Sequence, residues 1–141
     1  MSAGSSVAVA ATFVWLGLVL AISFLEAPLK FRAPGVTLRV GLGIGRLVFR
    51  ALNTAEAVLA VVVLIALLVA TPPIGVIAAP AVAIVTLAAQ FLFVRPGLTR
   101  RSNAVLAGED VPRSRAHHAY VALEVIKVTA LLTGGILLLT T

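Results

Sequence analysis

Long apolar stretches without a charged side chain alternate with short polar segments along this sequence. No Asp, Glu, Lys or Arg occurs in residues 1–25, 57–94 or 128–141. A helix of about 20 apolar residues crosses the hydrocarbon core of a membrane. The pattern predicts four spanning helices, at about residues 7–28, 42–70, 76–94 and 116–139. The second and third are separated by the turn sequence Thr71-Pro72-Pro73-Ile74-Gly75.

The composition excludes a soluble globular domain. Of the 141 residues, 61% are hydrophobic and only 11% are charged, whereas soluble domains carry about 25% charged residues. We therefore predict an all-α fold, an integral membrane four-helix bundle that forms a single transmembrane domain over residues 1–141. The chain contains no cysteine, and we expect no metal site, because no pair of ligands has the required spacing. A cleaved signal peptide is not expected, since residues 1–6 carry no positive side chain.

The charged residues occupy only two segments, 26–56 and 95–127, and basic residues dominate both. By the positive-inside rule, the loops at 31–40 and 95–115 are then cytoplasmic and both termini are extracytoplasmic. We expect the protein in the plasma (inner) membrane, with the lipid bilayer as its partner and anionic headgroups at the basic loops. Nucleic acid is not an expected partner, because the loops lack interleaved aromatic residues. A homo-oligomer is expected, since four short helices enclose little volume.

Several ionisable residues fall inside the predicted spans, where they are costly and usually face protein or water. At 100° per residue, one face of the second helix carries Arg46, Arg50, Asn53 and Glu56. One face of the fourth helix carries His117, Tyr120, Glu124 and Lys127. The helical rise places Glu56 and Glu124 at the same level, about 10 Å inside the cytoplasmic boundary. The first helix ends with Glu26 and Lys30, and the third has only Gln90.

Two interpretations of these residues stay open. In the first, the charges neutralise one another and hold the helices in register, with the pairs Glu26–Lys30, Glu124–Lys127 and Glu56 with Arg50 or Arg46. In the second, a cytoplasm-facing cavity binds or transports a small anionic or amphipathic ligand. Its lining would be Arg46, Arg50, Asn53, Glu56, His117, Tyr120 and Glu124, with Glu26, Lys30 and Lys127 as supporting charges.

Glycines and a short internal similarity complete the pattern. The sequence Gly41-Leu42-Gly43-Ile44-Gly45 and the pair Gly134-Gly135 predict close helix packing. Residues 102–107 predict a short interfacial helix that stops at Gly108. The segments 24–28 and 91–96 each close a helix with Phe-Leu and Pro, before a basic loop and a helix with a buried Glu. This similarity predicts two parallel hairpins about an axis along the membrane normal.

Most of the chain resembles the group of small four-span membrane proteins related to transmembrane protein 205. The resemblance rests on Pro28 and Phe31, Leu47 and Phe49, Arg95 and Pro96, and a fourth helix led by His117. That family tends to have Ser and Asn where this helix has Tyr120 and Glu124. The resemblance implies a membrane protein and no particular reaction, so non-enzymatic ligand binding is our main hypothesis.

The residues Arg46, Asn53 and Glu56 also resemble the second-helix pattern of the membrane-associated eicosanoid and glutathione metabolism family. This resemblance implies a glutathione-dependent transferase, a trimer in which these residues would hold glutathione between subunits. A third hypothesis is a structural subunit of a membrane complex, in which the charges serve packing alone. No catalytic residue is identified from the sequence.

Overall fold

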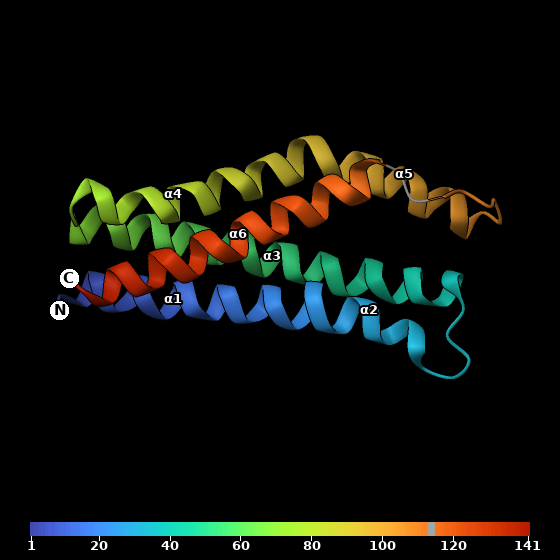
Figure 1. Ribbon diagram of the computed structural model, residues 1–141, viewed down its shortest axis with the longest axis horizontal. Coiled ribbons are helices and arrows are strands. Elements are labelled where there is room, and N and C mark those ends of the chain that lie inside the picture. Colours follow the sequence, from blue (N-terminus) through green and yellow to red (C-terminus); the bar gives the residue numbers. More distant parts are fainter. Residues whose placement is uncertain (113–114) are drawn as a thin grey trace.

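The computed structural model describes residues 1–112 and 115–141 and contains four long helical segments packed as a bundle (Figure 1). Each of them is long and apolar enough to cross a membrane, by length and composition. The first segment consists of α1 (Ala3–Val19), the π-helix η1 (Leu20–Glu26), α2 (Ala27–Leu29) and the 3₁₀ helix η2 (Lys30–Arg32). The second is α3 (Leu38–Ala70).

The third segment consists of α4 (Ile74–Ala89), the π-helix η3 (Gln90–Val94) and α5 (Arg95–Leu106), and the fourth is α6 (Arg115–Leu139). The prediction of an all-α bundle with four apolar helices is confirmed. The turn between the second and third helices also lies where the sequence predicts it. There Thr71 adopts a left-handed conformation with φ of 48°, and Pro73 caps the start of α4.

The helices extend further than the sequence predicts, because two prolines do not end them. A proline ring clashes with the carbonyl group four residues earlier in an α-helix. Both helices contain a wider π turn at this point, in which the residue before proline bonds five residues back. The N–H of Ala27 donates to the carbonyl oxygen of Ile22, and the N–H of Arg95 to that of Gln90. The predicted ends at Pro28 and Val94 were therefore wrong.

Three further boundaries differ from the sequence prediction. The first helix begins at Ala3 and not at residue 7. The second helix begins four residues early, at Leu38, because the side chain of Thr37 caps it by accepting a hydrogen bond from the N–H of Val40 at 3.2 Å. The short interfacial helix expected at residues 102–107 is the end of α5 and continues the third segment without a break.

The helices pack as two hairpins joined along one side. α1 packs along α3, α4 packs along α6, and α1 also packs along α6. By contrast α3 and α4 make far fewer contacts with each other, although they are consecutive. Both termini and the 71–73 turn lie at one end of the bundle, and the loops after η2 and α5 lie at the other (Figure 1). The charge-free and charged segments of the sequence therefore occupy opposite ends.

Many large apolar side chains are exposed on the outside of the bundle, whereas several charged and polar ones are buried within it. Leu68, Val85 and Phe93 are 68%, 67% and 80% exposed. The buried side chains include Glu56, Gln90, Glu124 and Lys127, none of which is more than 1% exposed. Apolar groups outside and charged groups inside are what a hydrocarbon environment favours, since lipid tails solvate Leu and Val but not ions.

Small residues allow the helices to approach closely. A Cβ atom added at Gly134 of α6 would lie 3.0 Å from the side chain of Pro80 of α4, and one at Gly135 would lie 2.7 Å from the ring of Phe13. The ring of Phe31 occupies the space beside Gly41, and Lys30 lies beside Gly45. The expectation of close packing at these glycines is confirmed, whereas Gly43 faces open space.

The packing at Gly134 generates a testable prediction. Gly134→Val adds a branched side chain against Pro80 and forces α4 and α6 apart, which we expect to cost about 1–3 kcal/mol of stability. Thermal unfolding of the protein in detergent measures this loss as a lower midpoint. Gly17→Val is the matched control, because nothing lies within 4 Å of a Cβ at Gly17. Equal midpoints for the two variants would contradict the packing assignment.

Candidate functional site

A lysine ammonium group lies at the centre of the bundle with its three donors occupied. Lys127 Nζ of α6 is 2.5 Å from Glu124 Oε1 and 2.6 Å from Glu56 Oε1 of α3. It also donates a hydrogen bond of 2.8 Å to Gln90 Oε1 of η3. The Lys127 side chain is completely buried. An ammonium group has three N–H donors and no acceptor, so these three oxygens match its full hydrogen-bonding capacity.

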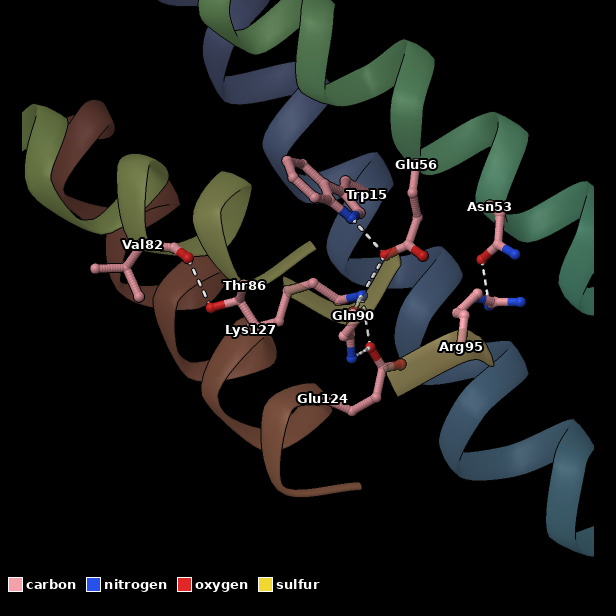
Figure 2. Close-up of polar contacts among 9 residues, drawn as sticks. All are labelled: Trp15, Asn53, Glu56, Val82, Thr86, Gln90, Arg95, Glu124 and Lys127. Atoms are coloured by element: carbon pink, nitrogen blue, oxygen red, sulfur yellow. Dashed lines mark hydrogen bonds and ion pairs between the residues drawn. The ribbon is translucent and has the colours of Figure 1, made fainter. Parts of the chain in front are cut away.

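Two neutral side chains complete this arrangement. Trp15 Nε1 of α1 donates to Glu56 Oε1 at 2.9 Å, and Gln90 Nε2 donates to Glu124 Oε1 at 2.8 Å. Figure 2 shows the five side chains converging from all four helical segments. We call Trp15, Glu56, Gln90, Glu124 and Lys127 the buried ion cluster. Each of its contacts is charge-assisted, and such hydrogen bonds are roughly twice as strong as neutral ones.

Local helix geometry explains how the cluster assembles. Tyr120, Glu124 and Lys127 follow the four- and three-residue spacing that aligns side chains on one face of α6. Gln90 is the first residue of the π turn in the third segment. Such turns shift the register of a helix by one residue and are frequent at functional sites. The π turn thereby contributes to the position of the Gln90 side chain.

Of the three ion pairs predicted from the sequence, two are confirmed. Glu124 pairs with Lys127, and Glu26 lies 3.8 Å from Lys30. The expectation that Glu56 pairs with Arg50 or Arg46 was wrong. Six and ten residues correspond to about 9 Å and 15 Å along a helix, and both arginines are exposed. Glu56 instead pairs with Lys127 of another helix.

A second layer, made of aromatic rings around an arginine, lies next to the cluster. The guanidinium carbon of Arg95 is 6.0 Å from the ring centre of Phe49 and 5.9 Å from those of Phe91 and Tyr120. Arg95 also donates a hydrogen bond to Asn53 Oδ1 of α3 (Figure 2). Cations over aromatic faces are held electrostatically as well as by packing. A residue that the sequence places in a loop is thus part of the interior.

The charges of these two layers balance. The cluster contains two carboxylates and one ammonium group, and the neighbouring Arg95 supplies the second positive charge. Tyr120 lies beside both Glu124 and Arg95. Glu124 Oε2 and Arg95 Nε are buried and have no hydrogen-bond partner among the described residues. Buried polar atoms of this kind are positions where a water or ligand atom would bind.

The remaining predicted site residues lie outside this centre. Arg46 is exposed and donates to Asn103 Oδ1 of α5, and Arg50 is exposed on α3. His117 is half-buried near the start of α6, with its ring 5.6 Å from that of His118. The predicted cavity lining is therefore divided: Asn53, Glu56, Tyr120 and Glu124 lie in the two central layers, and the other three residues lie nearer the basic end.

In the structure, each of the three residues that the second family resemblance implies as glutathione ligands contacts different side chains. Arg46 contacts Asn103, Asn53 contacts Arg95, and Glu56 contacts Lys127 and Trp15. Within the described residues, no group of three or more His, Asp or Glu side chains is arranged to hold a metal ion.

Sequence reasoning missed Trp15, assigned no role to Gln90 and placed Arg95 in a basic loop. Trp15 is the single tryptophan of the chain and Gln90 the single side-chain amide of the predicted span 76–94, which is the signal that marks them. Compared with known proteins, the chain matches no family model, no curated protein and no solved structure. The two family resemblances stay predictions based on the residues quoted for them.

The ion cluster predicts a strong effect of removing its only ammonium group. Lys127→Met leaves two buried carboxylates facing each other, and breaking a buried pair costs about 3–5 kcal/mol. We expect little folded protein, measured by thermal unfolding with the fluorescence of Trp15. Arg39→Met, which removes an exposed positive charge from α3, serves as control and leaves the midpoint unchanged.

The same experiment separates lost charge balance from lost packing. The double variant Glu124→Gln with Lys127→Met leaves the carboxylate of Glu56 balanced by Arg95, and we expect it to recover much of the stability lost in Lys127→Met. A double variant no more stable than the single one would show that charge imbalance is not the cause.

Proposed function

We propose that the chain is an integral protein of the plasma (inner) membrane, with cytoplasmic basic loops and extracytoplasmic termini. The placement of charge supports this orientation. The end formed by the termini and the 71–73 turn has no charged side chain, whereas the opposite end carries the surplus of positive charge. Positive residues accumulate on the cytoplasmic side of membrane proteins. The four apolar segments supply the required lengths.

We further propose that this protein binds a small anionic or amphipathic ligand from the cytoplasmic side, without catalysing a reaction. One observation carries this proposal. The two lysines, Lys30 and Lys127, form ion pairs with the three glutamates of the helices. The eight arginines that the structure describes pair with no carboxylate, and the loop residues Glu109 and Asp110 form no ion pair there either. This leaves the basic end with a surplus of positive charge that is not held in ion pairs.

In this proposal the buried ion cluster is a support and the arginines attract the ligand. Glu56 and Glu124 are buried and bonded within the bundle, so they hold the middle parts of the helices in fixed positions. The ligand then binds between the basic loops and the layer formed by Arg95 and its aromatic rings, which we call the Arg95 layer. Transport, as distinct from binding, would require a second conformation in which the cluster opens.

The two alternatives differ from this proposal in measurable ways. A glutathione-dependent transferase would need Arg46, Asn53 and Glu56 to face one ligand, whereas each has a different partner. A structural subunit would have the same buried cluster but no retained small molecule.

The orientation is testable because the chain has no cysteine. Single cysteines introduced at Ala33 and Ala107, both exposed at the basic end, should react with a membrane-impermeant maleimide only after the membrane is permeabilised. A cysteine at Ile74, which is 82% exposed at the other end, should react in intact cells. The opposite labelling pattern would reverse the proposed orientation.

Ligand binding is tested by mass spectrometry of small molecules released from the protein purified in mild detergent. We expect an anionic or amphipathic compound that also raises the unfolding midpoint when it is added back, because a ligand that binds only the folded state stabilises it. Glutathione with a model electrophile serves as the comparison and should give neither stabilisation nor conjugate. Conjugate formation would support the transferase alternative, and the absence of any retained anion would refute the proposed function.

A further inference from the structure

An open surface hollow of about 420 Å³ lies at the basic end of the bundle, between α5 and the start of α6. Three arginines line it, Arg100 and Arg101 from α5 and Arg115 from α6. We call this hollow the arginine pocket. It shares no residue with the buried ion cluster or the Arg95 layer, and none of its residues belongs to the candidate site derived from the sequence.

Backbone contacts hold two of the arginines in place while leaving their outer nitrogens available. Arg101 Nε donates to the carbonyl oxygens of Val111 and Pro112, both at 3.3 Å. Arg100 Nε donates to the carbonyl oxygen of Pro96, also at 3.3 Å. The terminal nitrogens of both side chains make no hydrogen bond with the described residues. Each of these guanidinium groups therefore has donors left for a ligand.

The pocket gathers three positive side chains that form no ion pair with a described carboxylate. Arg100, Arg101 and Arg115 form no ion pair with Glu109, Asp110 or any other described acidic residue. Like charges around a single hollow repel one another. An anion bound among them removes this repulsion, so the pocket is electrostatically suited to an anionic group.

The rest of the lining is apolar and tightly packed. Gly97 of α5 faces Ala116 of α6 so closely that an added Cβ would lie 2.8 Å from the Ala116 Cβ. The absence of a side chain at Gly97 brings the two helices together at this point, and Val111 adds further apolar surface. A ligand with a charged head and an apolar portion would satisfy both parts of this surface.

The level of the pocket in the bundle narrows the ligand class. The third segment runs without a break from Ile74, and Gly97 and Arg100 lie about 35 Å and 39 Å along it by the helical rise. The hydrocarbon core is about 30 Å thick. With Ile74 at the far boundary, the pocket lies in the headgroup region, where the phosphate groups of lipids are found.

We propose that the arginine pocket binds a phosphate anion, in the form of an anionic lipid headgroup or as free phosphate. Guanidinium groups bind phosphate oxygens through paired hydrogen bonds, and basic pockets between membrane helices bind anionic headgroups. The proposal rests on the proposed function and names the ligand class and the residues. The apolar lining and the level in the membrane favour the lipid.

The test measures binding of phosphatidylglycerol to the purified full-length protein by native mass spectrometry, with phosphatidylcholine and inorganic phosphate in parallel. The pocket variant is Arg100→Gln with Arg115→Gln, which leaves the Arg101 backbone contacts in place. The matched control is Arg32→Gln with Arg39→Gln, which removes the same charge from exposed residues outside the pocket. Trp15 fluorescence during unfolding verifies that both variants are folded. Arg100→Lys with Arg115→Lys retains the charge but not the paired hydrogen bonds.

We expect the wild-type protein to prefer phosphatidylglycerol over phosphatidylcholine. The pocket variant should bind phosphatidylglycerol roughly thirtyfold more weakly, the lysine variant should be intermediate, and the control should remain within a few-fold of wild type. If inorganic phosphate displaces the lipid, the arginine pocket binds phosphate as proposed, and its ligand is free phosphate.

If the pocket variant and the control variant bind phosphatidylglycerol equally weakly, the proposed phosphate site is wrong. The lipid would then be attracted only by the general positive charge of the surface. The absence of a preference for phosphatidylglycerol, together with no binding of inorganic phosphate, would overturn it as well. If another retained anion binds equally well to wild type and the pocket variant, the proposed function stands and this inference fails.

Discussion

The burial of one ammonium group constrains the whole bundle. Lys127 has three donors, and each finds an acceptor on a different side chain, with Glu56 contributed by α3 and Gln90 by η3. Trp15 brings α1 into the same network. A buried ion pair contributes little net stability against an apolar alternative, but losing one partner is expensive. The cluster therefore selects one set of neighbouring helices and one rotation for each of them.

Each buried glutamate of the cluster follows a π turn and a proline at the same distance along the chain. Pro28 and Glu56 are 28 positions apart, as are Pro96 and Glu124, so both halves of the chain repeat a π turn, a proline and a buried glutamate at one spacing. The neutral donors to the two glutamates do not follow this repeat, because Glu56 accepts a hydrogen bond from Trp15 whereas Glu124 accepts one from Gln90. The packing differs as well, since α1 and α6 are in close contact while α3 and α4 are not.

Periodicity and spacing along one helix were sufficient to predict the four helices, the 71–73 turn and the pairs Glu26–Lys30 and Glu124–Lys127. Contacts between helices required knowledge of which helices are neighbours, and no pattern in a single sequence supplies it. Glu56 was for this reason assigned to an arginine on its own helix and not to Lys127. Arg95 was placed in a loop because the proline after it was taken as a helix end, whereas a π turn accommodates that proline.

The two kinds of cation in this chain have different chemical tasks. A lysine ammonium is compact and can be surrounded by three oxygens in a dry interior, whereas a planar guanidinium presents donors in a fork that matches phosphate and carboxylate. Both lysines form ion pairs with glutamates of the helices. The hydrogen bonds of the described arginines go only to side-chain amides and backbone carbonyls. The net charge of +6 is thus carried by arginines at one end. The two acidic side chains at that end, Glu109 and Asp110, form no ion pair with any described arginine.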